Sequence, residues 1–340
     1  MVYDTIIVGG SYAGISAGLQ LARARRQILI IDAGKRRNRF ADSSHGFLGQ
    51  DGVNPGAIAS KAREQLMAYP TVEWVTDTAI HAKAEQEGYA ISVGSGLSFA
   101  ARRLILATGV KDELPPLPGL TALWGKKIFH CPYCHGYELN GGMIGVLASS
   151  PLAIHQALML PDWGPTTLFL NEAYTPDVPQ LAQLARRGVT VEAEPVLSIG
   201  EGQADITLAS GRIIRLAGLF IQPRTRLSSP LAVQLGCELE AGSTGEFIKV
   251  DAMRETNVPG VFACGDAACR RQRGHCRRRR RAHRRRRSSV SDISLKARAV
   301  NGAGCGQVLA DTHFKSIRGC LNAIKDGLNL RVQIFICSKS

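Results

Sequence analysis

Two cysteines separated by two residues lie near the middle of the sequence, and a histidine flanks each of them. The segment over residues 130–135 reads HCPYCH. Cysteines at this spacing can close a small disulfide ring at a helix start, where the helix dipole and a nearby imidazolium lower the pKa of a thiol. One sulfur can then exchange with a substrate while the other passes electrons onward, and a histidine can carry the proton. We therefore predict a redox centre whose catalytic residues are Cys131, Cys134, His135 and His130.

A zinc site is the main competing interpretation, because a Cys-x-x-Cys pair is half of many zinc centres. Zinc would need two further ligands at matching spacing. His130 and His135 are too close in sequence to complete a tetrahedron comfortably, and residues 1–268 contain no second paired motif. The sequence favours redox chemistry, predicts no metal, and leaves a pair of inert thiols as a third alternative. Cys237 and Cys264 are expected to be small core residues.

The N-terminal residues have the pattern of one βαβ unit. An apolar run over residues 4–8 precedes the sequence GGSYAG at 9–14, and a small-residue helix pattern follows to about Arg26. A second apolar run over residues 28–31 ends at Asp32. This order of strand, glycine turn, helix, strand and acidic residue is typical of dinucleotide-binding units.

The glycine turn itself supplies the residues that such a ligand needs. Gly9 and Gly14 take the first and last glycine positions of the fingerprint, and Ser11 stands where the middle glycine usually lies. A pyrophosphate would lie at the N-terminus of the helix that begins near Ala13, and Asp32 is correctly spaced to accept both ribose hydroxyls. The alternative is an ordinary strand-to-helix turn. The complete pattern favours a dinucleotide site.

The elements that must position these motifs form two α/β patterns, separated by a proline-rich crossing at residues 113–119. We predict two doubly wound, Rossmann-like α/β domains, one inserted in the other. The predicted parts are an outer domain at 1–113 and 245–268, an inserted domain at 114–244, and an atypical tail at 269–340. Further strands are predicted at 72–75, 89–93, 103–107, 143–147, 167–170, 216–221, 247–250 and from Val261, and further helices at 152–160 and 179–187.

Composition and charge narrow the function classes. The chain has 340 residues, of which 45% are hydrophobic, and a net charge of +14. Residues 1–268 hold 23 basic and 25 acidic side chains, whereas residues 269–340 hold 19 and 3, so the positive charge belongs wholly to the tail. The main body therefore gives no electrostatic reason to expect nucleic acid. With no visible signal peptide and no long apolar window, we expect a soluble, cytoplasmic protein without a membrane partner.

In their order and spacing, these motifs resemble the low-molecular-weight thioredoxin reductases, which are FAD-dependent pyridine nucleotide-disulfide oxidoreductases. The shared order is the glycine turn, Ala107-Thr108-Gly109, an inserted domain with C-x-x-C, and a closing Gly265-Asp266-Ala267. The resemblance covers about residues 1–268. The stretch CPYCHGYE at 131–138 and the loop at 37–50 look most similar to a branch of thioredoxin-reductase-like proteins and dithiol oxidases of gliotoxin- and holomycin-type biosynthesis.

The resemblance implies a role for each residue of the site. It implies that Cys134 faces the flavin, that Cys131 exchanges with the substrate, and that His135, with His130 as helper, does acid/base work. The implied partner is a thioredoxin-like protein or a small-molecule disulfide or dithiol, and the implied assembly is a homodimer. The residues implied to hold FAD are Gly9, Gly10, Ser11, Ala13, Gly14, Asp32, Ala33, Arg37, Arg39, His45, Gln50, Ala79, Thr108, Gly109, Gly265 and Asp266.

The inserted domain departs from the family where NADPH would bind. The turn after the strand at 143–147 reads ASSP over residues 148–151 and has no glycine, so a Cβ would press on the pyrophosphate. Leu170-Asn171-Glu172 stands where basic residues would hold a 2′-phosphate. NADPH is kept as a candidate donor with a degenerate motif. The alternatives are another reductant such as ferredoxin, or no donor, with a dithiol oxidase passing electrons to dioxygen.

The tail is the second departure. Residues 277–281 and 284–287 are arginine runs, whose closely spaced cations cannot pack as the small-residue helix that the family places against the flavin. One hypothesis is a reading-frame shift near residue 269, which turns GCC alanine codons into CGC arginine codons. The rival is a genuine arginine-rich arm on a flavin-deficient, non-catalytic protein that binds nucleic acid or another polyanion. Nucleic acid is not expected as a partner unless this arm is genuine.

Overall fold

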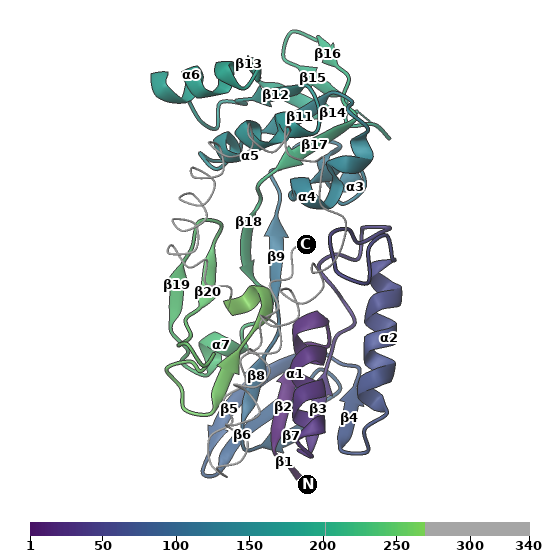
Figure 1. The fold of residues 1–340 in the computed structure, drawn as a ribbon. Coiled ribbons are helices and arrows are strands. Elements are labelled where there is room, and N and C mark those ends of the chain that lie inside the picture. The colour runs from purple at the N-terminus through teal and green to yellow at the C-terminus, as the bar shows by residue number, and fades with distance from the viewer. Residues whose placement is uncertain (201, 269–340) are drawn as a thin grey trace, which may run out of the picture. The chain divides into compact units, whose positions relative to one another are not determined.

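The computed structural model describes residues 1–200 and 202–268 (Figure 1). The arginine-rich tail lies outside the described residues, so the structure tests neither hypothesis about it. Within the described part, the two fold patterns expected from the sequence are present as two five-stranded parallel sheets.

The first parallel sheet has the strand order β21-β8-β2-β3-β4. Its strands β2, β3 and β8 are buried along their whole length, which is why they read as continuous apolar runs rather than alternating ones. The last strand of the described chain, β21, joins this sheet beside β8. The five strands are β2 (Thr5–Val8), β3 (Ile28–Ile31), β4 (Val72–Val75), β8 (Leu104–Leu106) and β21 (Val261–Ala263).

Two helices pack together beside this sheet. Helix α1 (Tyr12–Arg23) begins directly after the glycine turn, and α2 (Pro55–Met67) begins at a proline that Asn54 precedes as N-cap. The Asn54 side chain accepts hydrogen bonds from two backbone N–H groups of the first turn of α2, at 2.8 and 3.3 Å. Gly18 lets α1 approach closely, since a Cβ there would lie 3.0 Å from the Leu66 side chain.

A smaller mixed sheet, of order β1-β7-β6-β5, completes this part of the chain: β5, β6 and β7 are antiparallel, and β1 joins β7 in parallel. The helix α7 (Leu231–Gln234) packs on it, and the Gln234 side chain bonds to the backbone of Ala82 and Ile80. The hairpin of β19 and β20 contributes to the same core. These strands are β1 (Val2–Tyr3), β5 (Ala79–Glu85), β6 (Gly88–Val93), β7 (Ser98–Ala101), β19 (Leu239–Ala241) and β20 (Glu246–Ile248).

The second parallel sheet, of order β10-β17-β11-β12-β13, is built entirely from residues 128–221. A three-stranded antiparallel sheet, β14-β15-β16, lies between β13 and β17 in sequence. The strands are β10 (Ile128–Phe129), β11 (Ile144–Leu147), β12 (Thr166–Phe169), β13 (Thr190–Glu192), β14 (Val196–Ile199), β15 (Ile206–Leu208), β16 (Ile213–Ile214) and β17 (Gly218–Ile221). The helices are α3 (Leu120–Leu123), α4 (Pro132–His135), α5 (Ala153–Met159) and α6 (Val178–Arg186), with 3₁₀ turns η1 (Tyr137–Leu139) and η2 (Leu160–Asp162).

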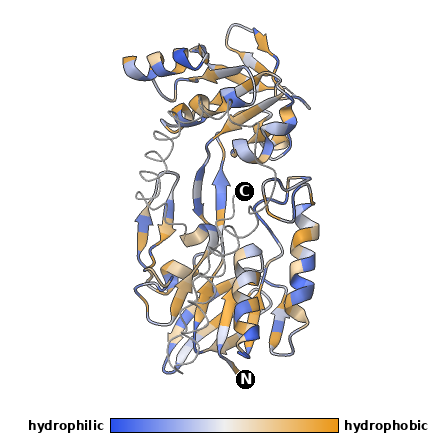
Figure 2. Cartoon of the chain, viewed as in Figure 1, coloured by the Kyte–Doolittle hydropathy of each residue, from blue (hydrophilic) through white to orange (hydrophobic). Residues whose placement is uncertain are grey.

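Two antiparallel strands, β9 (Val110–Glu113) and β18 (Arg224–Leu227), connect the two parallel sheets along the chain. They are visibly more hydrophilic than the strands of the parallel sheets (Figure 2). Because β21 returns to the first sheet after the second is complete, the topology is that of one α/β unit inserted in another, and the predicted fold class is confirmed. The domain boundaries at 113/114 and 244/245 stay a prediction. No helix among the described residues is both long and apolar enough to span a bilayer.

Candidate redox centre and dinucleotide site

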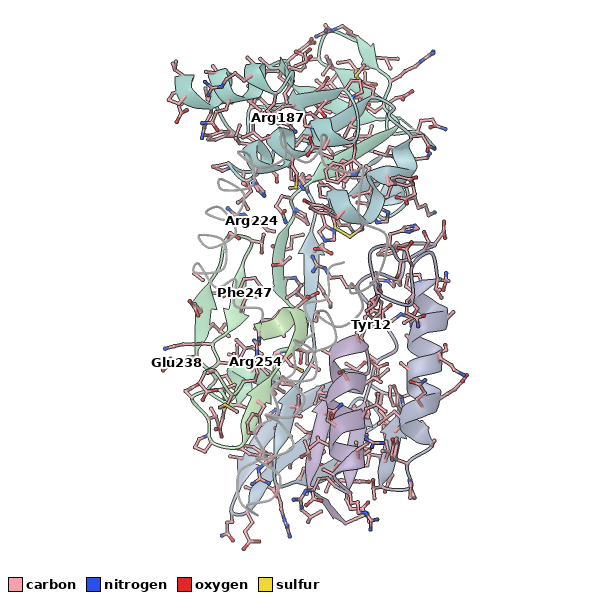
Figure 3. The ribbon with its side chains drawn as sticks, in the orientation of Figure 1. Tyr12, Arg187, Arg224, Glu238, Phe247 and Arg254 are labelled. Carbon is pink, nitrogen blue, oxygen red and sulfur yellow. A yellow bond between two sulfur atoms is a disulfide. The ribbon has the colours of Figure 1, made fainter. Side chains whose placement is uncertain are left out.

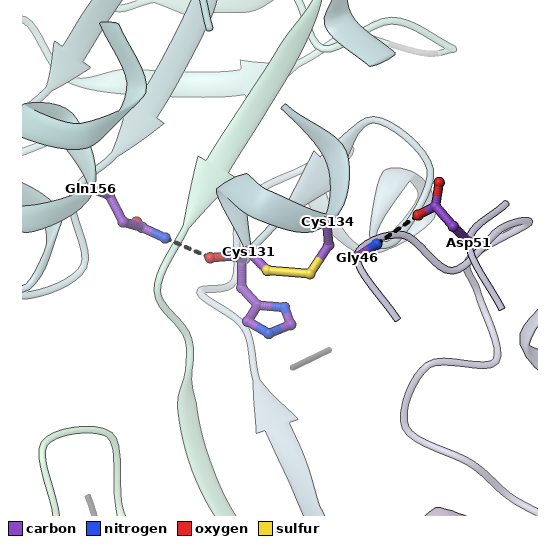
Figure 4. The surroundings of a disulfide bond; sticks show 6 residues. Gly46, Asp51, Cys131, Cys134 and Gln156 are labelled. Carbon is purple, nitrogen blue, oxygen red and sulfur yellow. Dashed lines mark hydrogen bonds between the residues drawn. A yellow bond between two sulfur atoms is a disulfide. The ribbon is translucent and has the colours of Figure 1, made fainter. Parts of the chain in front are cut away.

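Cys131 and Cys134 are joined by a disulfide across the first turn of α4 (Figure 4). Cys131 is the N-cap residue with extended backbone, and Pro132 follows at the first helical position, where its missing N–H costs nothing. The Cα atoms of the two cysteines are 5.4 Å apart. Cys134 is buried, with 8% of its surface exposed, whereas Cys131 is half-buried. The two cysteine residues are therefore unequally exposed, as a relay between an internal and an external partner requires.

The two flanking histidines have different environments. The His135 ring stacks on Phe129 with 4.1 Å between centroids, and burial, helped by the nearby charges of His130 and His45, lowers its pKa to about 4. His135 is therefore neutral near pH 7 and a weak base there, so it does not supply the imidazolium that the sequence led us to expect beside the thiols. The backbone carbonyl of His130 accepts a hydrogen bond from Gln156 Nε2 at 2.8 Å.

His45 lies close to a carboxylate of the redox segment. Its Nε2 is 3.5 Å from Glu138 Oε1 and 2.9 Å from Ser43 Oγ, and its Nδ1 is 3.6 Å from Asp51 Oδ1. Asp51 in turn accepts a hydrogen bond from the Gly46 N–H at 2.8 Å (Figure 4). These contacts hold the loop in a defined conformation, and the implied role of His45 in FAD binding stays a prediction.

The glycine turn is closely packed on all sides. A Cβ at Gly14 would fall well inside contact distance of the Gly9 carbonyl, and a Cβ at Gly9 would meet the Ala107 carbonyl. Gly10 donates its N–H to Asp32 Oδ1 at 2.9 Å, and its missing Cβ leaves room for the indole of Trp74. Each glycine is therefore required for a different reason.

Comparison with known proteins identifies the family that this geometry belongs to. The family model described as "Pyridine nucleotide-disulphide oxidoreductase" matches residues 3–287. The chain belongs to this family. Thioredoxin reductase sirT of Leptosphaeria maculans is 31% identical over 287 residues, covering 78% of this chain and 87% of the relative, and thioredoxin reductase tcpT of Claviceps purpurea is 32% identical over 281 residues, covering 78% and 86%. The crystal structure of the oxidoreductase from Agrobacterium tumefaciens is 54% identical, with a TM-score of 0.77, and the match covers 79% of this chain and 90% of that one.

Pyridine nucleotide-disulphide oxidoreductases use a flavin, and the glycine turn fits the dinucleotide part of FAD. Ser11 caps α1 only through its backbone, so no side chain competes for the first N–H groups of this helix. Among the described residues, Arg36 Nε and Trp74 Nε1 are buried donors without a hydrogen-bond partner. Trp74 lies against Gly10, and Arg36 Nη2 would be 3.3 Å from a Cβ at Gly56. Unsatisfied donors and a cradle that tolerates no Cβ are what a polar, phosphate-containing ligand would complete.

The other residues implied to hold FAD are placed as follows. Arg37 forms ion pairs with Asp112 and Asp266. The Arg39 guanidinium lies 4.1 Å from the Phe40 ring centroid. Ala79 is buried in the core beneath the smaller mixed sheet, so only its backbone could face a ligand. The described backbone has left-handed φ angles at Gly109 and Gly265. Ala13, Gln50 and Thr108 are partly exposed and Ala33 is exposed, and their contacts to FAD remain predictions.

In this oxidoreductase the two serine hydroxyl groups of the turn between β11 and α5 form hydrogen bonds within the protein. Ser149 Oγ donates to the Gln222 carbonyl at 2.7 Å, and Ser150 Oγ accepts the N–H of Leu152 at 3.3 Å. The next loop carries Asn171 and Glu172 in place of a cation. Both residues have left-handed backbone, and Asn171 Oδ1 accepts the N–H of Val196 at 2.9 Å. The departure seen in the sequence therefore extends to the local geometry of the nucleotide turn.

Several neighbours of the site were missed by sequence reasoning. Tyr12 donates its hydroxyl to the Pro55 carbonyl at 3.2 Å and accepts from Asn38 at 3.2 Å, so it ties the glycine turn to α2 (Figure 3). Trp163 meets Tyr133 edge-on, with ring centroids 5.2 Å apart. Asp112, Gln156 and Trp74 also contact site residues through space. Nothing in their sequence spacing signals these contacts.

Proposed function

We propose that this protein is an FAD-dependent thiol–disulfide oxidoreductase that passes electrons between flavin and a substrate disulfide or dithiol. The observation that carries the proposal is the disulfide between buried Cys134 and half-buried Cys131, in a chain of the pyridine nucleotide-disulphide oxidoreductase family. The difference in exposure supports Cys134 as the sulfur on the flavin side and Cys131 as the sulfur that meets the substrate.

The chemistry follows from the two sulfurs. In the direction of substrate reduction, the Cys131 thiolate attacks a substrate disulfide, forming a mixed disulfide while one substrate sulfur leaves as a thiol. The Cys134 thiolate then attacks Cys131 Sγ, which closes the protein disulfide and releases the second substrate thiol. Since its pKa is about 4, His135 is neutral near pH 7 but a weak base, so its proposed acid/base role in this sequence rests on the family resemblance rather than on its pKa. When bound, the flavin supplies the two electrons that reopen the disulfide.

A dithiol oxidase is the second candidate, and the nucleotide turn favours it. Ser149 and Ser150 stand where close approach to a pyrophosphate needs glycine, and the loop after β12 carries Glu172 instead of a cation. In this direction a substrate dithiol is oxidised to a disulfide as it reduces the Cys131–Cys134 disulfide to two thiols. Through a bound flavin, the two electrons would pass on to dioxygen, which with two protons gives hydrogen peroxide. NADPH then has no part in the reaction.

Partners and location are part of the proposal. The fungal relatives are named thioredoxin reductases, which supports a thioredoxin-like protein or a small disulfide or dithiol as the substrate. We further propose a homodimer, as the family resemblance implies, and a location in the cytoplasm.

An anaerobic absorption titration of the purified protein tests these proposals. A flavin band that NADPH bleaches supports the disulfide reductase. A band that ignores NADPH, is bleached by dithiothreitol and returns in air supports the dithiol oxidase. In either case the Cys134→Ser variant should keep the band but lose turnover. A purified protein without any flavin band would overturn both candidates.

A further inference from the structure

Arg37 bridges two carboxylates that lie far from it in sequence. Its Nε and Nη2 donate to the two oxygens of Asp112 at 3.0 and 2.6 Å, and its Nη1 donates to Asp266 Oδ2 at 3.0 Å. Asp112 is in β9, one of the two connecting strands, and Asp266 is in the 3₁₀ turn η3 (Gly265–Ala268), where the resemblance places FAD contacts. One guanidinium therefore links a connecting strand to the flavin side of the molecule.

The environment shows that this bridge is built into the fold. The side chain of Asp112 is 9% exposed, and those of Arg37 and Asp266 are 22% and 23% exposed. Burial alone would lower the pKa of Arg37, but the hydrogen bonds and charges of Asp112 and Asp266 raise it. A carboxylate buried this deeply is costly without a partner, so Asp112 needs Arg37 for the fold to tolerate it.

The geometry also fixes the direction in which the third bond points. A guanidinium is planar and rigid, and the side-on pair with Asp112 sets the orientation of its plane. With Nε and Nη2 held, Nη1 is aimed at Asp266. A shift or loss of the Asp112 carboxylate would therefore turn Nη1 away from Asp266, although no bond joins the two carboxylates.

We propose that Arg37 is a positioning residue, which orients the Asp266 carboxylate for FAD binding. Arg37 can do so only while Asp112 in the connecting strand holds its guanidinium in place. This inference rests on the proposed function, because it assumes that FAD binds beside Asp266. It adds that β9, the strand that precedes the redox segment in the chain, determines through Arg37 how the Asp266 carboxylate is oriented.

The test compares Asp112→Asn and Arg37→Lys with a matched control in the full-length protein. Glu113→Gln is the control, because Glu113 is the next residue of β9 and pairs with Arg226 at 3.2 Å in an exposed ion pair. The probe is FAD added to apoprotein, followed by flavin fluorescence, with the thermal unfolding midpoint of each apoprotein measured in parallel. The absorption maximum of the bound flavin is the spectroscopic readout.

We expect Asp112→Asn to weaken FAD binding about tenfold or more relative to Glu113→Gln, since an amide accepts only part of the Arg37 fork. Arg37→Lys should have a similar effect, because one ammonium cannot hold both carboxylates. The double variant should be no weaker than the single ones, and the flavin absorption maximum should shift in all three. Where Asp112→Asn does not fold, Arg37→Lys decides through the same readouts.

Three results would overturn the inference. FAD affinity of Asp112→Asn within twofold of the control would mean that Arg37 acts without Asp112. A lowered unfolding midpoint with unchanged FAD affinity and spectrum would mean that the bridge is only structural. Additive losses in the double variant would mean two independent effects. A wild-type protein that takes up no FAD would overturn the proposed function as well, so the two failures are distinguishable.

Discussion

Gln156, which is buried in α5, holds the residue that precedes the redox pair: its Nε2 donates to the His130 carbonyl at 2.8 Å. The other end of this side chain, Oε1, is a buried acceptor without a partner among the described residues. The Gln156 side chain therefore fixes the backbone beside Cys131, although its own oxygen stays without a hydrogen bond in the described part of the chain. Figure 4 shows the bond next to the disulfide.

Gln156→Leu should lower the free energy of unfolding by about 1–2 kcal/mol, because it leaves the His130 carbonyl without its donor. Chemical denaturation of the oxidised protein measures this change. The control is Gln203→Leu, which alters an exposed glutamine and should leave the free energy of unfolding unchanged. Gln180 is not suitable as a control, because its side chain completes the capping box of α6. A Gln156→Leu protein as stable as the wild type would show that the bond makes no net contribution.

In the reduced protein, Cys131 and Cys134 should react with iodoacetamide at different rates. We expect Cys131 to be alkylated first, because Cys134 is buried while Cys131 is partly exposed. Cys237 and Cys264 serve as internal controls: both are buried, and burial raises the pKa of both thiols, that of Cys264 to about 12. Peptide mass spectrometry after brief labelling reads the order. Faster labelling of Cys134 would reverse the assigned roles of the sulfurs.

His135 should make the protein less stable in mild acid. Its pKa is lowered to about 4 in the folded protein, below the ordinary value of 6.5, so the unfolded chain binds the proton first as the pH falls. Stability is fully present above pH 6.5 and is lost progressively toward pH 4, by about 2 kcal/mol between pH 7 and pH 5. Urea unfolding at the two pH values measures the loss. His135→Phe should remove most of this slope, and His81→Asn, at an exposed histidine, should keep it; an unchanged slope in His135→Phe would assign the effect elsewhere.

Gly14→Ala should abolish FAD binding and destabilise the chain by several kcal/mol, since the new methyl would overlap the Gly9 carbonyl. Flavin content after purification and thermal unfolding of the apoprotein measure the two effects. Gly200→Ala is the matched control, because a Cβ there would meet its nearest neighbour at an ordinary 3.4 Å and the backbone is not left-handed. A yellow, stable Gly14→Ala protein would contradict the predicted role of the glycine turn.

The sequence predicted those elements whose patterns are local. The strands at 28–31 and 72–75 were predicted with the observed bounds, and those at 89–93, 103–107 and 143–147 to within one residue at each end, because continuous or alternating apolar runs mark buried strands. Helix α2 was missed, because exposed and buried residues mix along it and only Pro55, Ile58, Ala59 and Leu66 are buried. Strand β9 was missed because three of its four residues are charged.

The site was predictable where chemistry and spacing coincide, and otherwise not. The disulfide and the glycine turn follow from short motifs, and the structure brings the members of each motif together. The burial of His135, which lowers its pKa, its stacking on Phe129, and the ion pair of Arg37 with Asp112 across 75 residues all depend on tertiary packing. Spacing along the chain carries no information about either contact.

The packing of Trp74 against Gly10 gives the molecule an intrinsic optical probe. The chain has three tryptophans, and the other two, Trp124 and Trp163, lie against His130 and Tyr133 of the redox segment. Indole emission is sensitive to its immediate surroundings. In a protein with Trp124→Phe and Trp163→Phe, all indole emission would come from Trp74 beside the glycine turn. Nucleotide arrival could then be timed without any label, and separately from events at the disulfide.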